Sequence, residues 1–386
     1  MNHIFNSSPA AKEERLCPNV QHLSALSVIH CKSSPRHSVA LEREYDEAEA
    51  IATVHEALKQ GINYIDTAPW YGQGHSEELL GKALKEIPRN AYYIATKVAR
   101  YETDPRKMFD FSRDKTLASV DYSLKLLGLD YVDIIQVHDI EFAPSLDIVV
   151  NETLPALQSV VAAGKARFIG VTGYPVSVLK EATERSNIKV DTVLSYTRDT
   201  LIDDTLNKFL PFFQSKGLGI INAAGVAMGL LTNAGPPEWH PAPDSLKKLC
   251  AAAGQYCKER GVELGRLAQH YTMAQPGIAT NLVGMNSREV LHSNLDILNN
   301  GLSDVEKQVL QEINTQFFDK IRPSHWENVE INALKEKLKT LVNRQQGITH
   351  ISTCKAFKED MGLSAATHNY HLQIEGQVRQ EMHTTF

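Results

Sequence analysis

Four polar residues in the first half of the chain have the types and spacing of an acid–base site. Asp66 ends the apolar run "INYID", and Tyr71 follows on a loop bounded by proline and glycine. Lys97 follows the run "YYIAT", and His138 ends "VDIIQVH". Each residue stands where a strand-like run stops, which in a barrel of parallel strands is the face that carries the chemistry.

These side chains complement one another chemically. A phenol has a pKa near 10, so it exchanges protons poorly at neutral pH. A neighbouring ammonium lowers that pKa toward the working range, whereas desolvation alone raises it. We expect Lys97 to supply the charge, Asp66 to hold Lys97, and His138 to orient a carbonyl or hydroxyl group. This set predicts proton transfer during carbonyl–alcohol interconversion, with a nicotinamide cofactor carrying the hydride.

Each of the four residues also has a purely structural explanation when it is taken alone. Tyr71 next to Trp70 could pack in a loop, Lys97 could be an ordinary charge, and Asp66 could cap a turn. His138 could be a buried histidine that is satisfied by its neighbours. Four complementary groups at successive strand ends are harder to explain by packing, so the set favours a catalytic function.

The elements that would position these residues alternate between helix and strand from about residue 46 to residue 315. The strand-like runs are "INYID", "YYIAT", "VDIIQVH", "RFIGVT", "TVLSY", "GIINAA" and "TNLVGM". Several are almost wholly apolar, as in parallel strands covered on both faces. The intervening helices carry end signals, with Asp46 and Glu49 as a capping box and glycines such as Gly61 and Gly128 as stops.

Seven runs are one short of a (β/α)8 TIM barrel. The weak run "HLSALSVIH", residues 22–30, is the candidate for an atypical first strand. A doubly wound open sheet is the alternative, but no G-x-G-x-x-G follows any strand. We therefore predict an atypical N-terminal segment with the first strand over residues 1–45, an α/β barrel over 46–331 and a partly helical or disordered C-terminal extension over 332–386.

Composition limits the classes of partner. The 386 residues carry a net charge of −6 with 42% hydrophobic residues, which gives no reason to expect nucleic acid or an anionic membrane. No stretch has the apolar length of a membrane span, and the N-terminus lacks the layout of a secretory signal. Five scattered cysteines predict neither a disulfide framework nor a zinc site. We expect a cytoplasmic protein, with the extension available for a protein contact.

Several longer stretches resemble the aldo-keto reductase family, in particular the branch that contains L-galactose dehydrogenase. They are "GINYIDTAPWYGQGHSEELLGKAL", "YYIATKVARY", "LGLDYVDIIQVHDIEF" and "GKARFIGVTGYP". The resemblance covers about residues 46–331. It implies a barrel that binds NAD(P) without a Rossmann fold, and it places the catalytic tetrad at Asp66, Tyr71, Lys97 and His138.

The resemblance also implies where the cofactor lies. The nicotinamide, the pyrophosphate and the adenosine would contact the ends of the fifth to eighth strands, at Thr172, Gly173, Ser195, Ala224, Gly225, Gly284, Met285, Asn286, Ser287 and Asn294. NADPH-preferring relatives place a lysine and an arginine after the eighth strand, where this chain has Gly284 and Val290. Arg288 is the only cation nearby, so the sequence favours NAD over NADP, unless Arg288 reaches the phosphate.

The first strand departs from the family pattern because it lacks a glycine-rich run. This departure predicts either a variant N-terminus or a barrel that closes imperfectly, with weakened stability and cofactor binding.

The leading hypothesis is an NAD(P)-dependent oxidoreductase that interconverts an alcohol or aldose with its carbonyl or lactone. Trp70, Asp139 and Trp239 are candidates for the pocket that takes a polyol, aldose or aldehyde. The alternative is a catalytically weak cofactor-binding module with a regulatory or interaction role. A metal-dependent hydrolase ranks last, because His138 stands alone on its strand. No metal is therefore expected.

Overall fold

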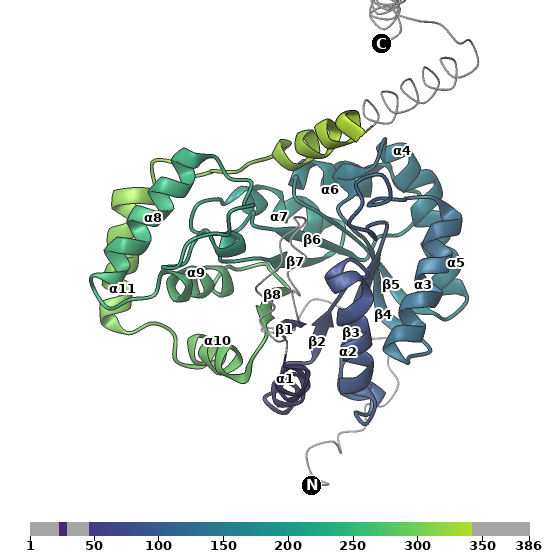
Figure 1. The fold of residues 1–386 in the computed structure, drawn as a ribbon, viewed down its shortest axis with the longest axis horizontal. Helices are drawn as coiled ribbons and strands as arrows, with labels where there is room; N and C mark the ends of the chain where they lie inside the picture. The colour runs from purple at the N-terminus through teal and green to yellow at the C-terminus, as the bar shows by residue number, and fades with distance from the viewer. Residues whose placement is uncertain (1–22, 29–45, 342–386) are drawn as a thin grey trace, which may run out of the picture. The chain divides into compact units, whose positions relative to one another are not determined.

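The computed structural model describes residues 23–28 and 46–341. Within these ranges, parallel strands close into a barrel in the order β1 to β8, with helices around it (Figure 1). The strands are β1 (Leu23–Val28), β2 (Tyr64–Asp66), β3 (Tyr93–Val98), β4 (Val132–Val137), β5 (Ala166–Gly173), β6 (Thr192–Tyr196), β7 (Gly219–Ala223) and β8 (Thr280–Met285). The predicted (β/α)8 fold is confirmed.

The first strand lies inside the weak run predicted to contain it. β1 pairs in parallel with β2 and β8, so that Ser27 lies opposite both Asp66 and Gly284. This pairing closes the sheet, and the expectation of imperfect closure is therefore wrong at the level of strand pairing. The rest of the predicted N-terminal segment lies outside the described residues.

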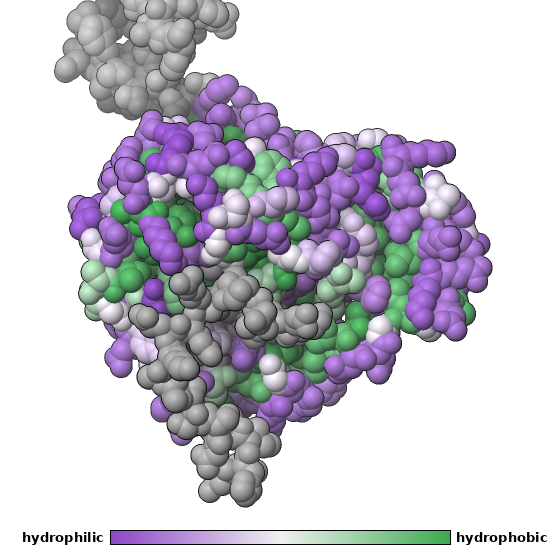
Figure 2. All heavy atoms as spheres, turned by 180° about the vertical axis from the view of Figure 1, so that it is seen from behind, coloured by the Kyte–Doolittle hydropathy of each residue, from purple (hydrophilic) through white to green (hydrophobic). Residues whose placement is uncertain are grey.

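Helices occupy the connections between successive strands, and more helices follow the last strand. They are α1 (Glu47–Lys59), α2 (His75–Leu84), α3 (Arg113–Leu127), α4 (Leu146–Ile148), α5 (Leu154–Ala162), α6 (Val176–Arg185), α7 (Thr205–Ser215), α8 (Asp244–Lys258), α9 (Leu264–Met273), α10 (Arg288–Asn300) and α11 (Asp304–Ile313). Hydrophilic side chains cover much of the face in Figure 2, with apolar ones visible in the recesses between them.

The capping box predicted for α1 is only half formed. Asp46 is the N-cap, and its side chain accepts a hydrogen bond from the Glu49 amide. In a full box the glutamate would reach back to the amide of the cap residue. The Glu49 carboxylate instead binds Arg288 at the start of α10. The second half of the predicted capping box is therefore wrong, because the Glu49 carboxylate forms an ion pair with Arg288.

The apolar core has a layer inside the barrel and a layer between strands and helices. Alternate strand residues face the barrel interior, and there Tyr64, Ala95, Ile134, Leu194, Ile221 and Leu282 form one buried cluster. Gly170 of β5 leaves room for its neighbours, because a Cβ there would lie 2.3 Å from Thr192 Oγ1 and 3.1 Å from Gln136 Cγ. The glycine therefore allows a long polar side chain from β4 to cross the barrel interior.

The chain divides into two compact units, residues 1–331 and 332–386. Residues 332–341 of the second unit are helical, and the remainder of that unit lies outside the described residues. Across the described ranges, no helix is both long enough and apolar enough to span a membrane.

Candidate active site

Asp66, Lys97 and Tyr71 meet at the ends of β2 and β3. The Lys97 ammonium forms a buried ion pair with Asp66 and donates to the Thr67 carbonyl oxygen at 2.9 Å. It lies 3.2 Å from the Tyr71 hydroxyl oxygen. Gln136 of β4 donates to the second oxygen of Asp66 at 2.8 Å. Both carboxylate oxygens are thus engaged, and the ammonium is fixed against the phenol.

The loop after β2 carries Tyr71 to this position. Pro69 precedes it, and the backbone then turns through left-handed conformations at Gly72 (φ 61°), Gln73 (φ 56°) and Gly74 (φ 92°) before α2 begins. Glycine adopts such positive φ values without steric cost. A side chain at Gly74 would also lie only 3.1 Å from Leu126 Cδ1. The Pro- and Gly-bounded loop therefore returns the chain to the barrel with the phenol near Lys97.

Burial and charge oppose each other at this site. Burial disfavours the Lys97 ammonium, but the charges of Asp66 and Tyr71 raise its pKa above the ordinary value. For Tyr71 the balance is reversed, since burial raises the pKa of the phenol and Lys97 only partly offsets this. The expectation of a net lowering is wrong, because desolvation of the phenol outweighs the single cation. Tyr71 therefore carries its proton at neutral pH.

His138 lies beside the phenol. Its ring makes an edge contact with the Tyr71 ring, with centroids 5.9 Å apart and planes at 90°. The side chain is buried, and Nε2 lies 3.7 Å from Asp139 Oδ2. An imidazole in this place can donate to, or accept from, an oxygen atom that also contacts the Tyr71 hydroxyl. The structure brings the four predicted residues together.

A second charged group flanks His138. Arg100 donates to Asp139 Oδ2 at 2.5 Å, and its guanidinium lies 4.3 Å from the centre of the Trp70 ring. Burial raises the pKa of Asp139, and Arg100 opposes that shift. Two of the three predicted pocket residues, Trp70 and Asp139, are therefore joined through Arg100. Trp239, in the segment after β7, is half exposed and stacks on His240.

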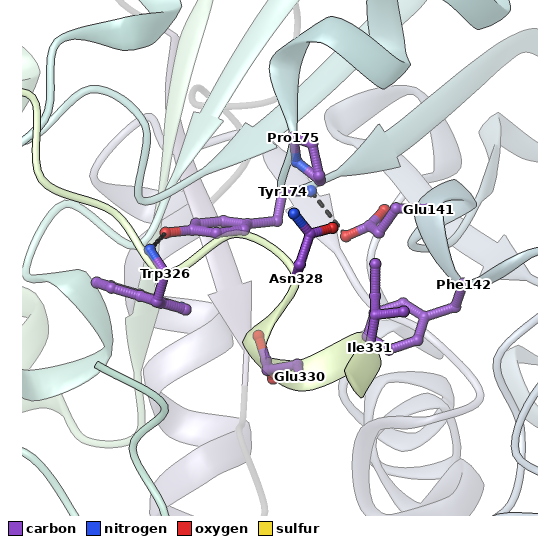
Figure 3. Close-up of a pocket in the computed structure, with 8 residues that line it drawn as sticks. All are labelled: Glu141, Phe142, Tyr174, Pro175, Trp326, Asn328, Glu330 and Ile331. Atoms are coloured by element: carbon purple, nitrogen blue, oxygen red, sulfur yellow. Dashed lines mark hydrogen bonds between the residues drawn. The ribbon is translucent and has the colours of Figure 1, made fainter. Parts of the chain in front are cut away.

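A second cleft (Figure 3) is lined by residues of the loop after β4, the end of β5 and the segment after α11, namely Glu141, Phe142, Tyr174, Pro175, Trp326, Asn328, Glu330 and Ile331. Glu141 accepts from the Tyr174 amide at 2.9 Å, and Tyr174 in turn accepts from the Trp326 amide at 2.9 Å. Burial raises the pKa of both Glu141 and Glu330. The cleft therefore combines aromatic rings with two carboxyl groups whose pKa burial raises.

The ends of β5 and β6 provide polar atoms that can form hydrogen bonds with the carboxamide group of a nicotinamide. Ser195 Oγ is buried and has no hydrogen-bond partner among the described residues. Thr172 Oγ1 accepts from the Asp139 amide at 3.1 Å, so it also holds the start of the β4 loop. At Gly173 a Cβ would lie 2.7 Å from Glu141 Oε2, which explains the glycine by packing. Of these three predicted residues, Ser195 has the clearest free bonding capacity.

The loop after β7 has an unusual backbone. Ala224, Ala227 and Met228 all adopt positive φ values, between 48° and 58°. Successive amides in such turns form concave sites for anions. A Cβ at Gly225 would lie 2.5 Å from Gln269 Oε1 of α9. Glycine is therefore needed to seat this loop on α9, while Ala224 provides the strained turn.

The loop after β8 is short and leads directly into α10. Ser287 is the N-cap, and its hydroxyl accepts from the Val290 amide at 3.3 Å. Asn294 donates to the Val290 carbonyl oxygen at 2.8 Å, Met285 is buried, and Gly284 and Asn286 are exposed. Arg288 is paired with Glu49. Residues at this end of the barrel can therefore contact a ribose or an adenine mainly through Asn286 and backbone groups.

Comparison with known proteins assigns the family. The model of the Aldo/keto reductase family matches residues 37–315. The chain is an aldo-keto reductase. As a member of this family it is an oxidoreductase.

Individual relatives agree with this assignment. The aldo-keto reductase is 47% identical over 252 residues to L-galactose dehydrogenase of Arabidopsis thaliana, covering 64% of this chain and 77% of that one. It is 33% identical over 312 residues to D-arabinose 1-dehydrogenase of Saccharomyces cerevisiae, covering 74% and 90% respectively. Among solved structures, the holo form of an aldo-keto reductase from Bacillus halodurans superposes with a TM-score of 0.57 at 28% identity, covering 74% of this chain and 91% of that chain.

Sequence reasoning missed several residues of this aldo-keto reductase site. Gln136 could have been found, because it lies on β4 two residues before His138, and alternate residues of a strand share a face. Arg100 and Glu330 could not, since each reaches the site from a loop or from the segment after α11. Across residues 23–28 and 46–341, no group of three or more His, Cys, Asp and Glu side chains could hold a metal ion.

Proposed function

We propose that this aldo-keto reductase interconverts an aldose or related alcohol with its lactone or carbonyl product, and that Tyr71 is the general acid–base. The observation that carries the proposal is the Lys97 ammonium, buried against Asp66 and 3.2 Å from the Tyr71 hydroxyl oxygen. The two relatives described above, an L-galactose dehydrogenase and a D-arabinose 1-dehydrogenase, support an aldose as substrate.

Each residue has a defined part in this proposal. Tyr71 takes the hydroxyl proton when an alcohol is oxidised and returns it when a carbonyl is reduced. Lys97 favours the phenolate electrostatically, Asp66 fixes Lys97, and Gln136 fixes Asp66. His138, packed against the Tyr71 ring, orients the reacting oxygen atom. The dinucleotide, when bound, supplies or accepts the hydride.

The residues present fit such a dinucleotide. The free Ser195 Oγ can bond to a carboxamide, and the positive-φ turn at Ala224 provides a concave backbone for phosphate groups. The loops after the seventh and eighth strands of such barrels often hold phosphate groups. We propose NAD rather than NADP, because the cation closest to the α10 N-terminus, Arg288, is already paired with a carboxylate.

The direct test is a cofactor and substrate panel with the purified full chain. We expect NAD-dependent oxidation of at least one aldose, detected by the absorbance of the reduced nicotinamide. Turnover with NADP should be weaker. A folded chain that oxidises no aldose and reduces no aldehyde with either dinucleotide would contradict the proposal.

A further inference from the structure

A buried carboxyl group from α2 lies behind the strand that carries Lys97. The Glu77 side chain is fully buried in the first turn of α2, and its Oε1 accepts a hydrogen bond from Thr96 Oγ1 at 2.5 Å. Thr96 precedes Lys97 on β3, and successive residues of a strand point to opposite faces. Lys97 therefore faces the barrel interior, while Thr96 faces the surrounding helices and meets Glu77.

The same turn of α2 also contacts the residue that follows Asp66. Ser76 Oγ lies 3.0 Å from Thr67 Oγ1, and both side chains are buried. The backbone carbonyl oxygen of Thr67 accepts in turn from the Lys97 ammonium at 2.9 Å. Two neighbouring residues of one helical turn are therefore bonded to the two strands that carry the Asp66–Lys97 ion pair.

The chain enters this turn directly from Tyr71. Only residues 72–74 separate the tyrosine from the start of α2, and Glu77 lies in the first turn of that helix. So short a link ties the position of the phenol to the position of the turn. The Glu77–Thr96 bond fixes the turn against β3, and it therefore bears on the 3.2 Å separation between the Tyr71 hydroxyl oxygen and Lys97 Nζ.

Packing alone does not explain a carboxyl group at this position. Burying a carboxyl group costs free energy that an apolar side chain of similar size would not cost. Burial raises the pKa of Glu77, whereas Thr96, Ser123 of α3 and the Lys97 charge oppose that shift. The effect of Lys97 shows that the carboxyl group lies within electrostatic range of the ammonium. The polar contact of Glu77 thus lies next to the acid–base group.

Building on the proposed function, we infer that Glu77 is a positioning residue, which holds the first turn of α2 on β3 through Thr96 and thereby sets the separation of Tyr71 from Lys97. It acts through this hydrogen bond and not on the reacting atoms. The attraction between an ammonium and a phenolate weakens with distance. A retreat of Lys97 by about 1 Å in a partly buried site raises the pKa of Tyr71 by about one pH unit.

The test compares kcat, KM and the pH profile of aldose oxidation in variants of the full chain. Glu77→Leu removes the acceptor for Thr96 and fills its volume with an apolar side chain. We expect the inflection of kcat to move up by about one pH unit, and kcat below the inflection to fall by about tenfold. KM for the aldose and Kd for NAD should stay within about twofold. Glu77→Gln keeps an oxygen acceptor for Thr96, so it should restore the inflection and most of kcat.

Two further variants separate positioning from a general loss of stability. Thr96→Val removes the donor of the same hydrogen bond, and it should move the inflection as Glu77→Leu does. Glu78→Gln is the matched control, because it changes the next carboxylate of α2, which is exposed and lies 3.6 Å from His75 Nδ1. It should leave the inflection in place. Urea unfolding midpoints are measured for every variant, since a loss of stability reduces the amount of active protein without moving the inflection.

The outcomes separate this inference from the proposed function. A raised inflection in Glu77→Leu and Thr96→Val, with recovery in Glu77→Gln, supports the inference. An unmoved inflection in Thr96→Val overturns it even if Glu77→Leu does not fold, and so does a Glu77→Gln variant as impaired as Glu77→Leu. Either result leaves the role of Tyr71 intact. An unsubstituted chain that turns over neither an aldose nor an aldehyde overturns the proposed function and the inference together.

Discussion

Lys97 is charged in a place where burial alone would favour its neutral form. Two oxygen acceptors, Asp66 and the Thr67 carbonyl, hold the ammonium in place. The Asp66 charge is in turn held by Gln136. The Lys97 ammonium lowers the free energy of the phenolate at Tyr71, although burial of the phenol has the larger effect on its pKa. The role of Lys97 is therefore electrostatic and depends on its distance from Tyr71.

Replacing Lys97 with methionine should change the pH dependence of oxidation. Alcohol oxidation needs the phenolate, so its rate rises with pH until Tyr71 is ionised. Because Lys97 lowers the pKa of Tyr71, its removal should move the inflection up by about one to three pH units. Below the inflection the rate should fall by about 10- to 1000-fold. The measurement is a profile of kcat against pH for the aldose.

Lys97→Arg is the matched control because it keeps the charge. We expect it to recover part of the rate and to return the inflection toward its original pH. If Lys97→Met and the unsubstituted chain show the same inflection, Lys97 does not act on the ionisation of Tyr71.

The four acid–base residues could be predicted from the sequence, because they lie at or just after the ends of strands that stand out as apolar runs. The net direction of the Tyr71 pKa shift could not, because burial of the phenol depends on residues from several elements. The position of Arg100 beside the site could not be predicted from the sequence either. Its bond to Asp139 joins the ends of β3 and β4, and an arginine after a strand is an ordinary surface charge in most proteins.

At the scale of elements, the loop between β6 and α7 holds an unexpected acid. Asp199 is fully buried, and among the described residues its side chain accepts a single long hydrogen bond, 3.4 Å, from Asn207. Burial raises the pKa of Asp199 to about 7, with Asp203 and Asp204 adding to the shift. An unfolded aspartate has a pKa near 3.9. The folded chain therefore binds a proton at this site between about pH 4 and pH 7, where the unfolded chain does not.

This difference predicts how Asp199→Asn changes stability. The folded state of the unsubstituted chain loses stability as pH rises from about 4 to about 7, by at most about 4 kcal/mol. Asparagine has no charge to lose, so the variant should gain more stability relative to the unsubstituted chain at pH 8 than at pH 5. Urea unfolding midpoints at the two pH values measure this. An equal difference between the two proteins at both pH values would contradict the assignment.

Helices and strands were largely predictable, whereas contacts of the segment after α11 were not. The seven apolar runs overlap β2 to β8 because strands covered on both faces need continuous apolar sequence. By contrast, Glu327 forms an ion pair with the buried Arg198 from the loop after β6, and Ser324 donates to the Ile202 carbonyl oxygen. Local patterns carry no signal for contacts made across more than one hundred residues.

At the scale of the whole molecule, closure of the barrel depends on the weakest strand. β1 has no strong pattern of its own, and it was inferred only because seven strands require an eighth. The pairing of Ser27 with Asp66 and Gly284 places β1 between the catalytic acid and the loop that leads to α10. The acid–base group, the predicted cofactor residues and the Glu49–Arg288 pair all belong to the unit of residues 1–331.

The most direct test of the acid–base account is Tyr71→Phe in the full chain, with turnover and dinucleotide binding measured on the same preparation. Phenylalanine keeps the ring beside His138 and removes only the hydroxyl group that lies 3.2 Å from Lys97. We predict that kcat for aldose oxidation falls by about 10²- to 10⁴-fold, while the Kd for NAD stays within about twofold. Retained turnover with unchanged binding would contradict the role of Tyr71.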